Sequence, residues 1–255
     1  MNNFFLACST LLQREVWRFV RQKNRIVGAI GTPLVFWILI GSGLNRSFNF
    51  GGNYLLYFFP GTIVLVLLFT AIFSTISIIE DRREGFLQGV LVAPIPRSAV
   101  VMGNLLGGTV LATLQGILFV ALSPLLGISL GIGNFFFIVL ILALMSFGLT
   151  GLGFILAWRL DSTQGFHAIM NLFLMPLWLL SGAFFPIEGA PAWLRMVMRI
   201  NPLTYSVSAL HHGFYQQATS LQAHLPSPFV SLGITFLFAG LMFAGAVKTA
   251  TKNYY

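Results

Sequence analysis

The chain has 255 residues, of which 57% are hydrophobic and only 8% are charged, and its mean hydropathy is +0.87. Soluble globular domains carry about 25% charged residues, so this composition excludes a water-soluble protein and predicts one polytopic membrane domain over residues 1–255. The formal net charge of +8 does not indicate a nucleic-acid partner, because the cations lie beside hydrophobic segments, where they orient the chain and meet anionic membrane lipid.

Residues 1–25 predict a cytoplasmic amphipathic helix lying in the membrane interface. Its apolar and cationic side chains recur at helical spacing on opposite faces, with Phe4, Cys8, Leu11, Leu12, Val16 and Phe19 on one and Arg14, Arg18, Arg21 and Arg25 on the other. The alternative is an extension of the first span, which the cations make costly because charge is expensive inside a bilayer.

Six hydrophobic segments then predict six transmembrane helices, because each approaches or exceeds the ~18 residues that indicate a crossing. They cover residues 26–43, 55–79, 99–126, 135–158, 168–185 and 229–247. No Asp, Glu, Lys or Arg occurs between Ser98 and Trp158, which indicates two crossings joined at the glycine-rich residues 127–134. Spans one to five thus occupy 26–185, and an outer hairpin and loop occupy 186–228. Proline inside a span kinks or ends a helix, as expected at Pro33, Pro124 and Pro176.

The cations predict the orientation. Eleven of the 14 Lys and Arg residues fall on one side of the six spans, and Arg46, Arg195 and Arg199 fall on the other. Cytoplasmic loops carry the excess of cations, so both termini are expected in the cytoplasm. The predicted location is the bacterial cytoplasmic (inner) membrane, in a multi-pass arrangement.

The chain lacks the motifs of an energy-converting or catalytic protein. Its only lysines are Lys23, Lys248 and Lys252, and none belongs to a phosphate-binding loop. The spans carry no carboxylate of the kind that ion-coupled transporters use, and no catalytic cluster is evident, so the chain is not expected to be an enzyme or to bind a cofactor. His211, His212 and His224 lack the spacing of a metal site. A stand-alone channel or secondary transporter and a membrane-embedded enzyme are the competing interpretations.

A charged island interrupts the apolar sequence between spans two and three. It begins with Glu80, Asp81, Arg82, Arg83, Glu84 and Gly85 and continues through a short apolar stretch to Arg97. A short helix with a charged start and an apolar body is suited to docking into a groove on a soluble partner. The alternative is a solvated loop with an interfacial turn.

A second interrupted segment lies on the predicted outer side. Pro191 opens a short amphipathic helix, and Asn201-Pro202 ends it and starts another. Such a pair of helices predicts a re-entrant or interfacial hairpin, whose outer-gate residues are Trp193, Met196, Val197, Ile200, Pro202 and Tyr205. The alternative is an ordinary surface connection.

Polar residues inside the spans could line a transport path or bond neighbouring helices, and glycines there could pack helices within one subunit or between two. Gln115 and Asn171 are candidates to line a transport path, although hydrogen bonding between helices explains such residues equally well. Two glycine motifs, Gly103-x-x-x-Gly107 and Gly148-x-x-Gly-x-Gly153, allow close approach of helices. Packing within one subunit is favoured over a dimer seam.

The chain resembles the permease subunits of ATP-binding-cassette type-2 transporters. The resemblance rests on Tyr57-Phe-Phe-Pro-Gly61, on the 80–85 cluster with Ala93-Pro-Ile-Pro-Arg97, and on a signature from Leu174 through Ser181, Pro191 and Pro202-Leu-Thr-Tyr205. This signature normally closes with Arg or Gln, where the chain has His211. The resemblance implies an exporter of drugs, lipid-linked molecules or polysaccharides.

The resemblance also implies the partners. Residues 80–97 would form the coupling helix that docks onto a separate ATP-binding subunit, and the N-terminal amphipathic helix would lie beside the same contact. Two copies of the chain and two ATP-binding subunits, which hold the ATP and Mg, would complete the transporter.

Overall fold

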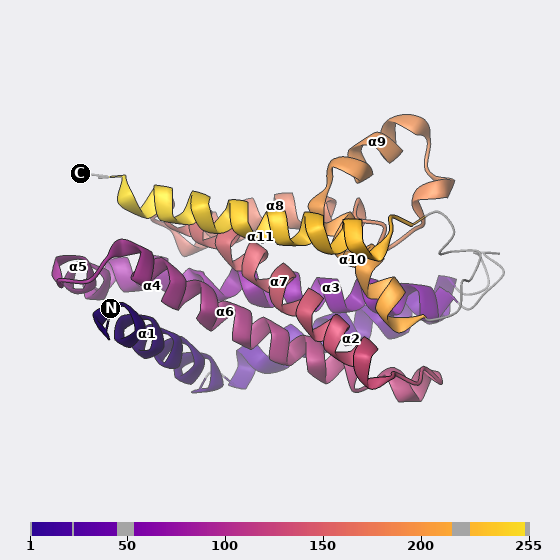
Figure 1. Cartoon of the computed structure of the whole chain (residues 1–255), viewed down its shortest axis with the longest axis horizontal. Helices are drawn as coiled ribbons and strands as arrows, with labels where there is room; N and C mark the ends of the chain where they lie inside the picture. Colours follow the sequence, from indigo (N-terminus) through magenta and orange to yellow (C-terminus); the bar gives the residue numbers. More distant parts are fainter. Residues whose placement is uncertain (1, 22, 45–53, 216–224, 253–255) are drawn as a thin grey trace.

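The computed structural model describes residues 2–21, 23–44, 54–215 and 225–252. All regular structure in these ranges is helical, as predicted, and the long helices run side by side along one axis (Figure 1). The α-helices are α1 Asn2–Arg21, α2 Lys23–Leu44, α3 Tyr54–Ser74, α4 Ile76–Arg83, α5 Phe86–Val92, α6 Arg97–Val120, α7 Ile132–Ala157, α8 Thr163–Leu179, α9 Ala192–Ile200, α10 Pro202–Phe214 and α11 Pro228–Thr251. Two short 3₁₀ helices, η1 Ser123–Leu126 and η2 Ile187–Gly189, complete the described elements.

Within the described ranges, four helical segments are long and apolar enough to cross a membrane. They are Tyr54–Arg83, Arg97–Leu126, Ile132–Ala157 and Pro228–Thr251. Ile30–Leu44 is a shorter apolar helix, and α8 has 17 residues, or about 25 Å at 1.5 Å per residue, against a hydrocarbon core of about 30 Å. The structure therefore supports an all-α integral membrane protein, and the six-span topology stays a prediction.

The predicted end of the fifth span was wrong. The fifth span was expected to reach residue 185, but α8 ends at Leu179, and Gly182 follows with a positive φ of 79°, a backbone conformation that glycine adopts without strain. The second span, predicted to end at residue 79, agrees to within four positions with the helical segment that ends at Arg83. The third was predicted to end at residue 126, where the helical segment made of α6 and η1 also ends.

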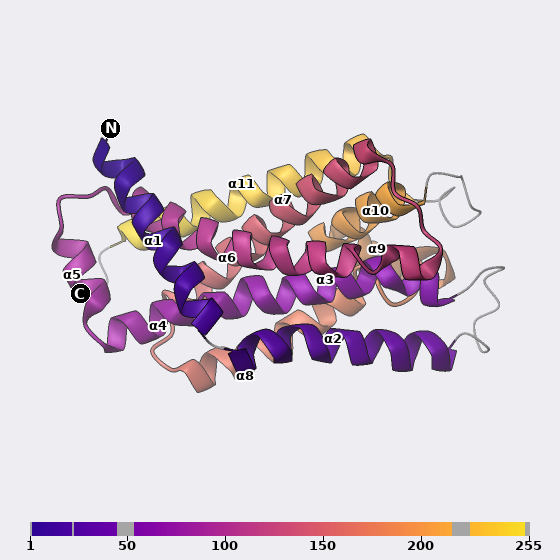
Figure 2. The same ribbon diagram turned by 90° about the horizontal axis from the view of Figure 1, so that it is seen from below.

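Helix α3 forms the centre of the molecule. It contacts α2, α6, α7 and α10, and Figure 2 shows it running through the middle of the bundle, with α2 along one side and α6 along another. Its side chains are buried on all sides, including the fully buried Phe58, Phe59 and Ile63. A helix that is apolar all round is typical of such a central position.

The glycine motifs pack helices within the chain, as predicted. A Cβ at Gly103 would lie 2.8 Å from the Leu11 side chain, and one at Gly107 would lie 2.7 Å from that of Glu15, so this face of α6 holds α1. A Cβ at Gly151 would lie 2.9 Å from the Met242 side chain, so α7 holds α11 in the same way.

The two ends of the described chain lie at the same end of the bundle, beside α4 and α5 (Figures 1 and 2). This arrangement agrees with an even number of crossings. Arg46, counted among the outer cations, and His224 lie outside the described residues, as does the middle of the predicted outer loop, 216–224.

Candidate functional site

The charged island forms a bend between two short helices. Glu80 to Arg83 make the last turn of α4, and Glu84 caps that helix. Gly85 follows with a φ of 78° and starts α5, so the chain reverses at a residue whose conformation favours glycine. The island is helical on both sides of this bend, and its side chains point in different directions.

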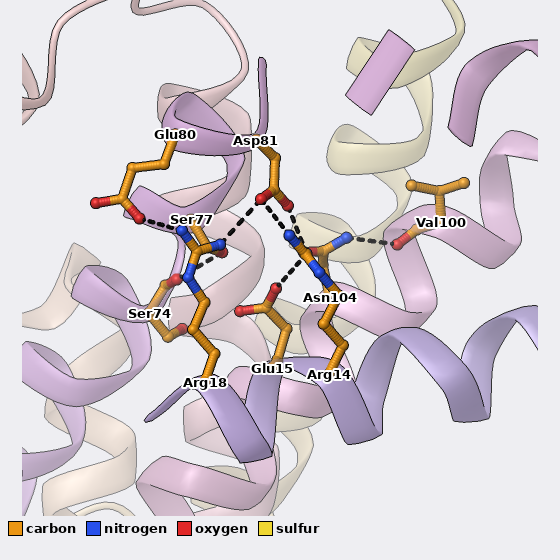
Figure 3. A network of polar contacts seen from close by, with 9 residues as sticks. All are labelled: Arg14, Glu15, Arg18, Ser74, Ser77, Glu80, Asp81, Val100 and Asn104. Carbon is orange, nitrogen blue, oxygen red and sulfur yellow. Dashed lines mark hydrogen bonds and ion pairs between the residues drawn. The ribbon is translucent and has the colours of Figure 1, made fainter. Parts of the chain in front are cut away.

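Asp81 binds the N-terminal helix through two arginines (Figure 3). Its carboxylate accepts hydrogen bonds from Arg14 at 2.5 and 2.7 Å and from Arg18 at 2.9 Å. Arg18 also donates to Glu80 at 2.6 Å. Asp81 is only 4% exposed, and charge-assisted bonds of this kind are roughly twice as strong as neutral ones. These contacts form a latch, Arg14–Arg18–Glu80–Asp81, that fastens α1 to α4.

Glu15 is a buried carboxyl group beside the latch that the sequence analysis did not single out. It is 6% exposed and lies 3.3 Å from the Arg14 guanidinium. Burial raises the pKa of the Glu15 carboxyl above its ordinary value, an effect that a hydrogen bond with Ser77 partly opposes. Glu15 is the one acidic residue of α1, whose other charged residues are all arginines. This contrast in the sequence could have identified it.

The other half of the island binds a different part of the bundle. Arg82 donates to the carbonyl oxygen of Trp158 at 2.5 Å and to the carboxylate of Asp161 at 3.0 Å. Arg83 donates to the carbonyl oxygen of Asp161 at 2.6 Å. The connection between α7 and α8 is therefore attached to the end of α4.

The surface that remains open belongs to α5 and the bend. Glu84 is exposed, and Val92 is 85% exposed. An apolar groove of about 500 Å³ separates α5 from α1. Its walls include Leu6, Thr10, Phe86, Val90 and Ile95. The predicted docking segment thus has an internal part, centred on Asp81, and an outward part on α5.

The outer hairpin has an exposed apolar face. Trp193, Met196 and Ile200 are 68–73% exposed, and Val197 is 42% exposed. Met198, on another face of α9, is fully buried. Asn201 donates from its side chain to the Leu177 carbonyl oxygen and accepts from the Leu203 backbone N–H. The hairpin is therefore attached to α8, while most of its predicted gate face is exposed.

The remaining two predicted gate residues lie at the start of α10. Pro202 is its first residue, where the fixed φ of proline suits a helix start. The Tyr205 hydroxyl donates to the Arg199 carbonyl oxygen at 2.9 Å. Both residues therefore set the angle between α9 and α10.

The start of α3 is hydrogen-bonded to the turn after α8. The Tyr57 hydroxyl donates to the Gly182 carbonyl oxygen, the Tyr54 hydroxyl donates to the Phe184 carbonyl oxygen, and the Trp178 indole N–H donates to the Gly61 carbonyl oxygen, at 2.5–2.8 Å. A Cβ at Gly61 would lie 2.4 Å from the Ala183 carbonyl oxygen. The motif Tyr57-Phe-Phe-Pro-Gly61 is therefore one half of an outer clasp between α3 and residues 178–184.

The path candidates occupy different environments. Gln115 is buried and accepts a hydrogen bond from Thr70 of α3, which is the interhelical bond given above as the alternative to a path role. Asn171 is exposed on α8. A cavity of about 500 Å³ lies beside α2, α3 and α8, and its walls combine Phe69 and Phe73 with Thr32, Thr70, Glu80 and His167.

The sequence model of the ABC-2 type transporter family matches residues 7–215. The chain belongs to the ABC-2 type transporter family. The matched residues include most of α1 and all of α2 to α10, and therefore the latch, the charged island and the two helices of the outer hairpin, whereas α11 lies outside the match.

The relatives are named as transport permeases. The chain is 29% identical over 217 residues to ycf38 of Cyanophora paradoxa, a transport permease by name, covering 81% of this chain and 73% of that protein. It is 24% identical over 221 residues to the inner membrane transport permease YadH of Escherichia coli K12, covering 84% and 85%. YbhR of the same organism, named as a multidrug ABC transporter permease, is 29% identical over 64% of this chain and 44% of its own length. The family and these names support a transport permease subunit rather than an enzyme.

Proposed function

We propose that this permease subunit works in an ATP-driven exporter and receives its mechanical input through α5. The observation that carries the proposal is the division of the charged island. Asp81 fastens α4 to α1, whereas Val92 and Glu84 of the adjoining segment face outward. A partner that pushes on α5 would therefore move α4 and α1 together.

The proposed partner is a separate ATP-binding subunit, two copies of which would supply ATP, Mg and hydrolysis to two copies of this chain. Membership of the ABC-2 family supports such a partnership in general. The groove between α1 and α5 is apolar and open, which suits a helix-in-groove contact. Residues of the latch act inside the permease in this proposal, and Glu84 and α5 meet the partner.

Co-purification of the permease with its ATP-binding subunit tests this assignment. Val92→Asp should weaken the complex at least tenfold, because a charge in an apolar contact loses hydrophobic burial and must be desolvated. Leu125→Asp is the matched control, since Leu125 is 82% exposed but lies in η1, beyond the end of α6 that points away from α4 and α5 (Figure 2). Equal retention of the partner by both variants would refute the role of α5.

We further propose that the cargo is amphipathic, drawn from lipid-linked molecules, drugs or polysaccharides. The cavity beside α2, α3 and α8 supports this, because it places aromatic walls next to hydroxyl, imidazole and carboxylate groups. Gln115 and Asn171 stay the proposed path-lining residues, although neither belongs to the lining of this cavity. Phe73→Ala should lower transport while leaving the complex with the ATP-binding subunit intact, whereas unchanged transport would exclude the cavity.

The exposed face of α9 is proposed to close the outer end of the path against the second copy of the chain. Trp193, Met196, Val197 and Ile200 of this face are left exposed by the residues that the structure describes. Large exposed apolar patches mark protein or membrane contacts. If a second copy of the chain covers this face, cysteines placed at residue 197 in the two copies should cross-link.

A bacterial cytoplasmic membrane with both termini in the cytoplasm is the proposed location. The eleven-to-three distribution of cations supports it. Reporter domains fused after Tyr255 and inserted at Gly189 should report opposite compartments. The same compartment for both fusions would refute the six-span topology.

A further inference from the structure

A basic pocket lies at the end of the bundle that carries α4 and α5. It has a volume of about 310 Å³. Four cations, Arg82, Arg97, Arg159 and Lys252, line it together with one acid, Asp161. Nothing in the coupling role proposed above requires this concentration of positive charge.

The hydrogen bonds of Arg82 and Arg97 to described residues go mostly to backbone carbonyl oxygens. Arg97 donates to the carbonyl oxygens of Ala250 and Thr251 at 2.9 and 3.2 Å. Arg82 donates to the Trp158 carbonyl oxygen and pairs with Asp161, whose side chain is 91% exposed. Among the described residues that line the pocket, four carry a formal positive charge and one carries a negative charge.

The pocket lies where three apolar helices end. Arg97 is the first residue of α6, Trp158 caps the end of α7, and Lys252 caps the end of α11. These three helices belong to segments long enough to cross a membrane, so their ends mark the boundary between hydrocarbon and water. Phospholipid phosphates lie at this depth.

The floor of the pocket is apolar. Leu87 and Leu91 of α5 line it beside Trp158, and Leu87 and Trp158 are 7% and 8% exposed. A ligand that fits must therefore combine a phosphate group with adjoining apolar or uncharged atoms. Basic pockets between the ends of transmembrane helices bind anionic lipid head groups in this way.

We propose that this pocket binds a phosphate group, and its depth points to the head group of an anionic phospholipid. Arg159 and Lys252 would supply direct contacts, and Arg82 and Arg97, held by helix-end carbonyls, would supply fixed positive charge. Because Leu87 and Leu91 belong to α5, a bound head group would connect the proposed coupling helix to the ends of α7 and α11. An anionic lipid would thus bind the permease at this defined pocket.

The test measures binding of dioctanoyl phosphatidylglycerol to the full-length permease in detergent, from the dependence of Tm on lipid concentration. Each basic residue near an anionic head group contributes about a fivefold change in affinity. The variant Arg159→Gln/Lys252→Gln should therefore bind about 25-fold more weakly. The matched control is Arg195→Gln/Arg199→Gln, which removes two cations from α9 and should bind like the wild type.

Further arms separate the sources of the phosphate. Dioctanoyl phosphatidylcholine should bind more weakly than the anionic lipid. Equal stabilisation by inorganic phosphate would assign the pocket to a soluble phosphate and overturn the lipid assignment. Equal binding by wild type and Arg159→Gln/Lys252→Gln, or an equal loss in the α9 control, would overturn the site itself. Loss of lipid binding in the complex with the ATP-binding subunit would assign the pocket to an acidic segment of that partner.

Discussion

Replacing Asp81 with asparagine should release α1 from the bundle. The substitution keeps the size of the side chain but replaces the negatively charged carboxylate, which accepts three hydrogen bonds from Arg14 and Arg18, with a neutral amide. Removing one partner of a buried ion pair costs about 3–5 kcal/mol, and an exposed pair contributes only ~0–1 kcal/mol. Asp81 is buried but the two arginine side chains are 29% and 22% exposed, so we expect an intermediate cost of about 2–3 kcal/mol.

The chain carries its own reporter for this release. Cys8 of α1 is the only cysteine, it is 7% exposed, and its thiol donates to the Ala99 carbonyl oxygen at 3.4 Å. A maleimide reaches it when α1 leaves α6, so the labelling rate follows the equilibrium of that opening. At 1.4 kcal/mol per tenfold, the expected cost raises the rate about 30- to 150-fold.

Asp161→Asn is the matched control, because the same substitution at an exposed carboxylate, which pairs with Arg82 and not with α1 in the described structure, should leave Cys8 protected. Far-UV circular dichroism and a single symmetric gel-filtration peak establish that both variants remain folded, and labelling is compared at one pH. Labelling of Asp81→Asn at the wild-type rate would refute the latch. An equal acceleration in Asp161→Asn would show that the effect is not specific to Asp81.

Three further predictions concern single positions. Because burial raises the pKa of the Glu15 carboxyl, the folded chain binds this proton more tightly than the unfolded chain. The protonated carboxyl therefore contributes to the stability of the fold below about pH 4.5, and this stability is lost as pH rises. In Glu15→Gln, Tm should therefore fall less between pH 4 and 8 than it does in the wild type. Parallel curves of Tm against pH for the two proteins would contradict this. Gly61→Ala should cost about 1–3 kcal/mol and lower Tm by about 3–10 °C, whereas Gly133→Ala, which meets open space, should not lower it. Replacing Trp193 and Ile200 with serine removes apolar contacts that contribute about 1.5–3 kcal/mol each when buried, so dye leak through reconstituted permease should rise, and unchanged leak would leave α9 as a surface connection.

The long helices were predictable because hydrophobic runs of bilayer length leave few alternatives. The residues of α7 and α11 agree with the predicted spans to within four positions at each end. The end of α8 was not predicted, because the apolar sequence continues through Phe184 and Phe185. Ser181-Gly182 was the available signal, since glycine at positive φ is a common helix terminator.

The island shows where sequence reasoning stops. Its charge density marked residues 80–85 as a special segment, and a docking role was inferred for all of them. Four successive residues of a helix turn point in four directions, about 100° apart, so Asp81 can face α1 while Arg82 faces the α7–α8 connection. Which residue meets which partner depends on packing between segments separated by 67 positions, and no local pattern contains that information.

The positions of the latch and the outer clasp connect the two ends of the molecule. Helices α3 and α4 together form a 30-residue helical segment from Tyr54 to Arg83, interrupted by one turn at Thr75. Tyr54 and Tyr57 fix one end to the turn that precedes the outer hairpin, and Asp81 fixes the other end to α1. Closely packed interiors transmit displacement because they contain few voids to absorb it. A movement imposed at α5 therefore has a short mechanical route to the outer hairpin, and we expect that route to fail when either attachment is removed, even if the partner still binds.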